Sequence, residues 1–296
     1  MVDVIDYKQH KHVTRRLVTG EDATTLVELL VTLLLSSIFL GVVYDTFITN
    51  SNIMMESEVV STTDSKARAI LDLMSFEIRM MGAGMPIGQA EFLSGQSGLG
   101  DAPDALLAGS DDDTLMFRMN ETGYTTFSST DFTPDDGLSF SIVSTSDVQV
   151  DDVIYISDMA VGGSDGFRGQ ISSVLGSQLT VDAGYVASED AIFPSGSTVA
   201  RTTEITYTSP PGGSGITRSN GGDALVLGTG TSFSLEYLDE DGDEVDPPLS
   251  LTERVNEITA IQITVNAQSS RPLKDGTFYT AEAEQIVALR NLNLNH

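Results

Sequence analysis

The sequence LVELLVTLLLSSIFLGVVY, from Leu26 to Tyr44, decides how this chain folds. Glu28 is the one acidic residue in the segment, and the segment contains no Lys, Arg or His. A helix needs about 20 predominantly apolar residues to cross a bilayer. The sequence therefore predicts a transmembrane helix over about residues 26–44.

The charges on either side of this segment predict its orientation. Nearby Lys and Arg residues lie on the N-terminal side, whereas Asp45, Glu56 and Glu58 follow the segment. Basic residues favour the cytoplasmic side of a membrane. We therefore expect a single-pass protein with its N-terminus inside. The first 23 residues have no apolar run of their own, so they differ from an ordinary secretory signal.

The helix is expected to continue past the membrane, because the sequence from Asp45 to Met81 contains neither Gly nor Pro. Apolar residues recur there at spacings of three and four, which indicates an amphipathic helix; they are Ala67, Ile70, Leu71, Met74, Ile78 and Met81. The expected polar face carries Asp64, Lys66, Arg68, Asp72, Glu77 and Arg79. Gly82 and Gly84 then end a helix that spans residues 24–81, with an amphipathic stalk over 45–81.

A β-rich domain is expected over residues 87–296, where Gly, Ser, Thr and Asp separate short β-favouring runs. The expected strands are Thr114–Asn120, Leu138–Val143, Val153–Asp158, Gln178–Asp182, Ser197–Tyr207, Ala224–Leu227, Ser232–Tyr237 and Glu257–Ala267. Residues 209–222 are expected to form a hairpin or surface loop. The predicted fold class is α+β: a long N-terminal helix followed by a mostly antiparallel β-rich domain.

Composition excludes several classes of function. The 296 residues contain 15 Lys and Arg against 43 Asp and Glu, a formal charge of −28, which disfavours nucleic-acid binding. There is no cysteine, and the three histidines, His10, His12 and His296, lie near the chain ends. Thiolate chemistry is therefore excluded, and histidine-based catalysis is disfavoured. We expect a non-enzymatic protein that requires no cofactor.

The sequence Thr25-Leu26-Val27-Glu28-Leu29-Leu30, followed by an apolar run, resembles the N-terminal signal of type IV pilins and type II secretion pseudopilins. In that family a prepilin peptidase removes a cytoplasmic leader, and a carboxylate at the fifth mature position recruits the subunit into the filament. Aligning Glu28 with that position implies a leader of residues 1–23, with cleavage between Ala23 and Thr24. The family usually has Gly and Phe at these two positions. Cleavage after Gly20 would instead leave Glu28 at the eighth mature position.

The segment from Leu71 to Gly84 resembles the end of the helix in PilW-type minor pilins. The order of Ile205–Tyr207, Ile216–Arg218, Val226–Tyr237 and Val287–Asn291 resembles the C-terminal sheet of the same family. The resemblance implies a minor pilin that takes part in assembly or priming, at or near the pilus tip. Its implied partners are major and minor pilin subunits, prepilin peptidase and the inner-membrane assembly platform. Its implied location is the inner membrane and then the pilus at the cell surface. A GspJ-like pseudopilin is the alternative within the family.

Carboxylates alternate in the sequence DEDGDEVD, which spans residues 239–246. Oxygen ligands at such spacing suit calcium, and the candidate ligands are Asp239, Asp241, Asp243 and Asp246. Gly242 comes too early for an EF-hand, so a solvated turn between two strands is the alternative. This motif supports a further alternative function, a membrane-anchored, calcium-dependent adhesin or binding module.

Overall fold

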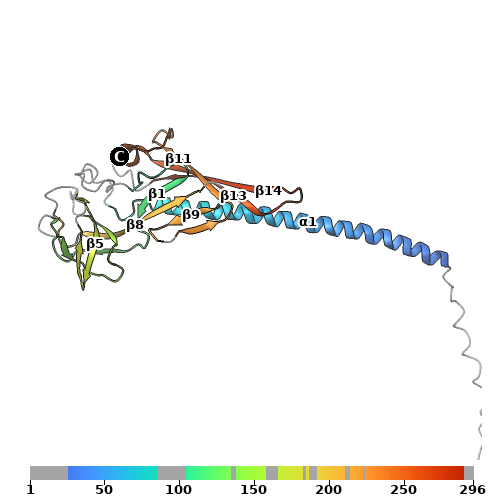
Figure 1. The fold of residues 1–296 in the computed structure, drawn as a ribbon, viewed down its shortest axis with the longest axis horizontal. Coiled ribbons are helices and arrows are strands. Elements are labelled where there is room, and N and C mark those ends of the chain that lie inside the picture. The colour runs from blue at the N-terminus through green and yellow to red at the C-terminus, as the bar shows by residue number, and fades with distance from the viewer. Residues whose placement is uncertain are drawn as a thin grey trace, which may run out of the picture. The chain divides into compact units, whose positions relative to one another are not determined.

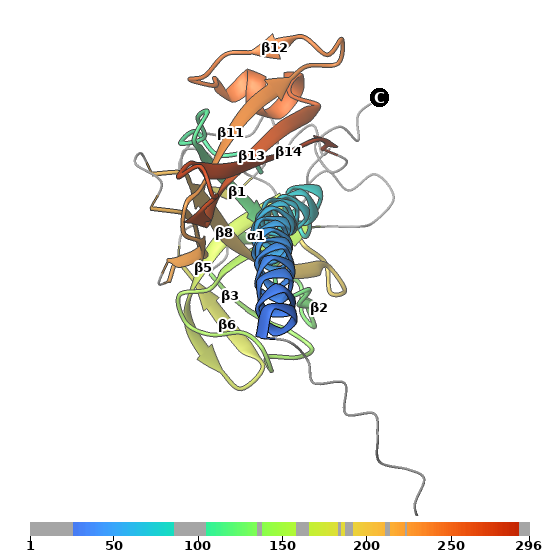
Figure 2. The same ribbon diagram turned by 90° about the vertical axis from the view of Figure 1, so that its right-hand side faces the viewer.

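A computed structural model of the chain describes residues 26–85, 105–134, 138–157, 166–182, 185–186, 192–210, 214–222 and 224–289. The chain divides into two compact units between Met55 and Glu56. The first unit contains the apolar part of helix α1, and the second contains the rest of α1 together with the strands (Figures 1 and 2). The fold is α+β, as the sequence predicts.

Helix α1 (Leu26–Arg79) is 54 residues long and is followed by turns at residues 80–85. Gly84, with φ +82°, belongs to these turns, and a Cβ atom there would lie 3.0 Å from the Cβ of Asn120. The backbone of Ala83 accepts a hydrogen bond from the Asn120 N–H at 2.9 Å. Glycine therefore lets the end of the helix pass close to the end of strand β1.

The described strands of the second unit form two sheets, and every neighbouring pair is antiparallel. The first sheet comprises β1 (Thr114–Met119), β2 (Thr125–Phe127), β3 (Ser139–Ser141), β4 (Val153–Ser157), β5 (Gly166–Leu175), β6 (Gln178–Val181), β7 (Tyr185–Val186), β8 (Thr198–Thr208), β9 (Ile216–Ser219) and β10 (Leu225–Gly228). The second comprises β11 (Thr231–Leu238), β12 (Glu244–Val245), β13 (Ala260–Pro272) and β14 (Phe278–Ala288). A π-helical turn, Glu253–Glu257, precedes β13.

Two hydrophobic cores stabilise the second unit. The larger core joins the inner face of α1 to β1, β8, β9, β11, β13 and β14. The smaller core contains no residue of α1 and is centred on Phe132, whose ring contacts those of Phe140, Phe167 and Phe193 at centroid distances of 4.7–5.9 Å. Aromatic pairs at these distances contribute about 0.5–1.5 kcal/mol beyond their burial.

All eight expected strands are present, with shifted ends. The π-helical turn delays β13 to Ala260, three residues after its expected start at Glu257. Strands β2, β5, β7, β9, β12 and β14 were not among the strands expected from residue pattern, although β9 and the end of β14 coincide with Ile216–Arg218 and Val287, which the resemblance placed in a sheet. Strand β9 lies inside the segment expected to form a hairpin or loop. In β14 the inward positions include Ala281 and Ala283, whose small side chains give little hydrophobic alternation.

Candidate functional site

Helix α1 presents an exposed apolar surface in the first unit. Every residue from Leu26 to Asn50 is exposed, including Phe39, Tyr44 and Phe47. The helix contains a segment long and apolar enough to cross a membrane. An apolar surface of this extent is stable only when lipid or other protein covers it.

Glu28 lies in the first turn of α1 as the structure describes it. Its backbone carbonyl accepts a hydrogen bond from the Thr32 hydroxyl at 2.7 Å. The expected cleavage residues, Ala23 and Thr24, lie outside the described residues, as does the expected leader. Placing a charged carboxylate within hydrocarbon costs about 3 kcal/mol on insertion scales, so such residues usually have a function.

In the second unit, α1 packs against the sheets through the predicted apolar stripe. Ala67, Ile70, Leu71, Met74 and Ile78 are all buried. Burial of an Ile, Leu or Met side chain contributes about 1.5–3 kcal/mol relative to full exposure. This half of the helix is therefore held firmly by the β domain.

One carboxylate lies within this buried stripe, contrary to the sequence prediction. Glu77 was expected on the polar face of the helix, but it is only 7% exposed. It follows Met74 by three residues and Ile70 by seven, which is the spacing of the buried face. The prediction was wrong because it ranked residue type above position.

The carboxylate of Glu77 accepts hydrogen bonds from two side chains of the first sheet. The Tyr207 hydroxyl of β8 donates a hydrogen bond of 2.6 Å to Glu77 Oε2. The guanidinium of Arg218 on β9 donates from Nε at 3.0 Å to both carboxylate oxygens. The Nη2 atom of Arg218 also lies 2.6 Å from Oε1 of Glu121. Helix and sheet are therefore joined by a partly buried ion pair, in which Glu77 also accepts a hydrogen bond from Tyr207 and Arg218 also contacts Glu121.

The environment of this cluster changes the pKa of several groups. Burial, reinforced by the Glu77 carboxylate, raises the pKa of Tyr207. Burial alone would lower the pKa of Arg218, but its hydrogen bonds with Glu77 and Glu121 raise it. Burial likewise opposes ionisation of Glu121, but hydrogen bonds from Arg218 and Asn220 outweigh it and lower the Glu121 pKa. The cluster is a structural ion pair with a neutral tyrosine at neutral pH.

Further hydrogen bonds join α1 to the β13–β14 hairpin or its neighbours. Lys66 Nζ donates to the carbonyl oxygens of Thr229 at 2.8 Å and Gln268 at 3.2 Å. The Tyr279 hydroxyl donates to Asp64 at 2.9 Å. At the turn of the hairpin, the backbone N–H of Lys274 donates to Glu56 at 3.0 Å. These contacts fix the hairpin alongside α1, as Figure 1 shows.

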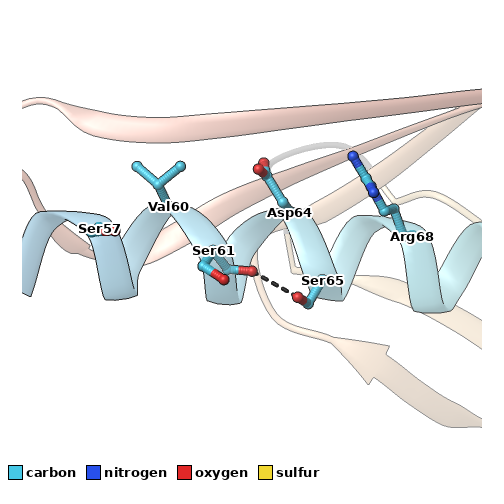
Figure 3. Close-up of a pocket in the computed structure, with 6 residues that line it drawn as sticks. All are labelled: Ser57, Val60, Ser61, Asp64, Ser65 and Arg68. Atoms are coloured by element: carbon cyan, nitrogen blue, oxygen red, sulfur yellow. Dashed lines mark hydrogen bonds between the residues drawn. The ribbon is translucent and has the colours of Figure 1, made fainter.

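A shallow groove of about 300 Å³ lies along α1 in the second unit (Figure 3), on a face that includes Asp64, the acceptor of the Tyr279 hydrogen bond. It is lined by Ser57, Val60, Ser61, Asp64, Ser65 and Arg68. Side chains at spacings of three and four share one helix face, and small residues on such a face allow close approach of another helix. The groove is open rather than enclosed, so it offers a packing surface and no enclosed substrate cavity.

The acidic sequence that begins at Asp239 forms a tight turn between β11 and β12. Asp239 Oδ1 accepts hydrogen bonds from the backbone N–H groups of Asp241 at 3.0 Å and Asp243 at 2.8 Å. Among the described residues no group of three or more Asp, Glu or His side chains is arranged to hold a metal ion. Asp239 and its neighbours, including Asp246, therefore do not form a preassembled site. Calcium binding stays a prediction, which a calcium titration followed by thermal unfolding tests.

The chain matches no family model, no curated protein and no solved structure.

Proposed function

We propose that the chain is a minor subunit of a type IV pilus, inserted in the inner membrane with its N-terminus inside and incorporated into the filament through α1. In this proposal prepilin peptidase cleaves between Ala23 and Thr24, and Glu28 then recruits the subunit. In this proposal the protein contributes to the assembly of the filament and catalyses no reaction.

One observation supports the proposal more than any other. A single uninterrupted helix carries an exposed apolar surface with Glu28 in its first described turn, and it continues into a stripe buried by the β domain. The buried half ties the domain to the helix, whereas the exposed apolar half needs a lipid or protein environment. This division of one helix is what a filament subunit requires.

Glu28 supplies a physical reason for ordered assembly. The α-amino group of an adjacent processed subunit can neutralise a carboxylate in a lipid-buried bundle. Such a pair offsets the desolvation of both charges and fixes the register between neighbouring helices. The groove around Ser61 and Ser65 allows another helix to approach above the membrane segment.

Shearing filaments from cells and probing them for this chain tests the proposal. We expect the chain in the filament fraction, with a mature N-terminus at Thr24 by mass spectrometry. Its retention in the membrane fraction, uncleaved, would contradict assembly. A chain that is cleaved but absent from pili, and needed for protein secretion, would support the pseudopilin alternative.

A further inference from the structure

Strand β14 leaves one complete strand edge open among the described residues. It is the last strand in the order β12-β11-β13-β14 and pairs only with β13. It is 11 residues long. An edge strand of this length exposes a row of N–H and C=O groups that can pair with another strand.

The register shows which residues form the open edge. The Leu289 N–H donates to the Thr259 carbonyl at 2.8 Å, so residue 289 faces β13. The Thr277 carbonyl also faces inward, since it accepts a hydrogen bond from Leu273. Backbone groups alternate in direction along a strand. The even-numbered residues therefore direct their backbone groups to the open edge; they are Phe278, Thr280, Glu282, Glu284, Ile286 and Ala288.

Several of the usual protections of an edge strand are missing from β14, which has Glu282 and Glu284 as its only charged residues. Residues 278–288 contain no Pro, Lys or Gly, and the strand has no bulge between Thr280 and Ala288. Soluble proteins commonly use such features to prevent pairing with other chains. The side chains of Phe278 and Ile286 are 49% and 57% exposed, which adds apolar surface near both ends.

The charges on β14 indicate which kind of strand can pair with its open edge. Glu282 and Glu284 are exposed and lie on the solvent face at the centre of β14. Full antiparallel overlap of two copies of β14 places Glu282 of each copy opposite Glu284 of the other. Like charges directly opposite are destabilising, whereas opposite charges stabilise a strand pair. The edge therefore disfavours a second copy and favours a cationic strand.

We propose that β14 is a docking edge for a strand from a different protein chain, one that carries Lys or Arg at alternating positions facing Glu282 and Glu284. Main-chain hydrogen bonds from the even-numbered residues supply the attachment, and the two carboxylates supply the selectivity. The inference rests on β14 alone and stands independently of the pilus proposal.

A labelled 11-residue peptide with alternating Lys and Val tests the proposal on the full chain in lipid nanodiscs. The control peptide has the same sequence, with N-methyl groups on the amides that would pair with β14. Because the protein is strongly acidic, this control separates strand pairing from simple charge attraction. Fluorescence polarisation measures the Kd of each peptide. We expect the unmodified peptide to bind at least about tenfold more tightly than the N-methylated peptide, which corresponds to about 1.4 kcal/mol of binding free energy.

Substitutions locate the binding edge. The Glu282→Lys/Glu284→Lys double variant should lose at least about tenfold in affinity for the Lys peptide and gain affinity for a Glu peptide. The matched control, Glu236→Lys/Glu240→Lys, makes the same charge change on two exposed residues outside β14 and should have a much smaller effect. Circular dichroism checks that both variants are folded.

Hydrogen exchange supplies a second readout. Peptide binding should slow exchange at the amides of Thr280, Glu282, Glu284 and Ile286. Equal binding of the N-methylated peptide, equal effects of the two double variants, or unchanged exchange in β14 would overturn the proposal. Self-association of the wild-type chain through β14 would overturn the choice of a different chain as partner.

Discussion

Glu77 of α1 and Arg218 of β9 form a partly buried ion pair between residues 141 positions apart in the sequence. The pair holds the last turns of the helix against the first sheet. Because Tyr207 also donates to Glu77, the carboxylate is satisfied from two strands. This cluster, together with the apolar stripe, makes the helix and the β domain one structural unit from Glu56 onward.

Replacing Glu77 by Gln should destabilise the protein. The change leaves the partly buried guanidinium of Arg218 without one of its two carboxylate partners. We expect the free energy of unfolding to fall by about 2 kcal/mol, less than the 3–5 kcal/mol typical of a fully broken buried pair, because Glu121 still contacts Arg218. Urea denaturation measures this change. The exposed Asp72→Asn variant on the same helix is the control, and an equal effect of the two would contradict the role of Glu77.

Acid should remove the contribution of Glu121. Its pKa is lowered in the folded state from the ordinary value of 4.5. A group with a depressed folded pKa stabilises the protein above its unfolded pKa, and this contribution is lost as the pH falls through the folded pKa. The melting temperature of Glu121→Gln should therefore lie below that of wild type at pH 7, and the gap should close below pH 4.5. A gap that stays constant from pH 7 to pH 3 would count against the ion pair.

Two methionines of α1 provide a matched comparison of the two halves of the helix. Met74 is fully buried, whereas Met54 is 71% exposed. Met74→Ala should lower the free energy of unfolding by about 2–5 kcal/mol, because it removes buried apolar surface and leaves a cavity. Met54→Ala should change it by less than about 0.5 kcal/mol. Thermal and urea unfolding of the full chain in detergent compare the two variants. Similar losses in the free energy of unfolding would contradict the exposure of Met54.

The helix was the part of the fold most accessible to sequence analysis. Residues 45–81 lack helix breakers, and the stripe through Met74 has a clear period, so both the helix and its buried face could be predicted. Glu77 was misplaced although its spacing from Met74 fits the buried face, because a carboxylate was expected to face solvent. Its partners, Arg218 and Tyr207, come from distant strands, and no local signal in the sequence reveals them.

Strand β14 shows the same limit in the sheet. Its inward residues are Tyr279, Ala281, Ala283, Gln285 and Val287, of which Val287 alone is β-branched. Gln285 packs inward because its side chain accepts a hydrogen bond from Ser75 of α1. The strand is specified by its pairing with β13, a long strand with strong alternation at Ile261, Ile263 and Val265.

The central claim, that α1 incorporates the chain into a filament through Glu28, is tested most directly by one measurement. The amounts of wild type, Glu28→Ala and the exposed-site control Glu58→Ala are quantified in membranes and in sheared filaments. We predict equal amounts of all three in membranes, and a loss of Glu28→Ala from filaments of at least about tenfold, the effect of 1.4 kcal/mol of lost interaction. Wild-type amounts of Glu28→Ala in filaments would contradict the account.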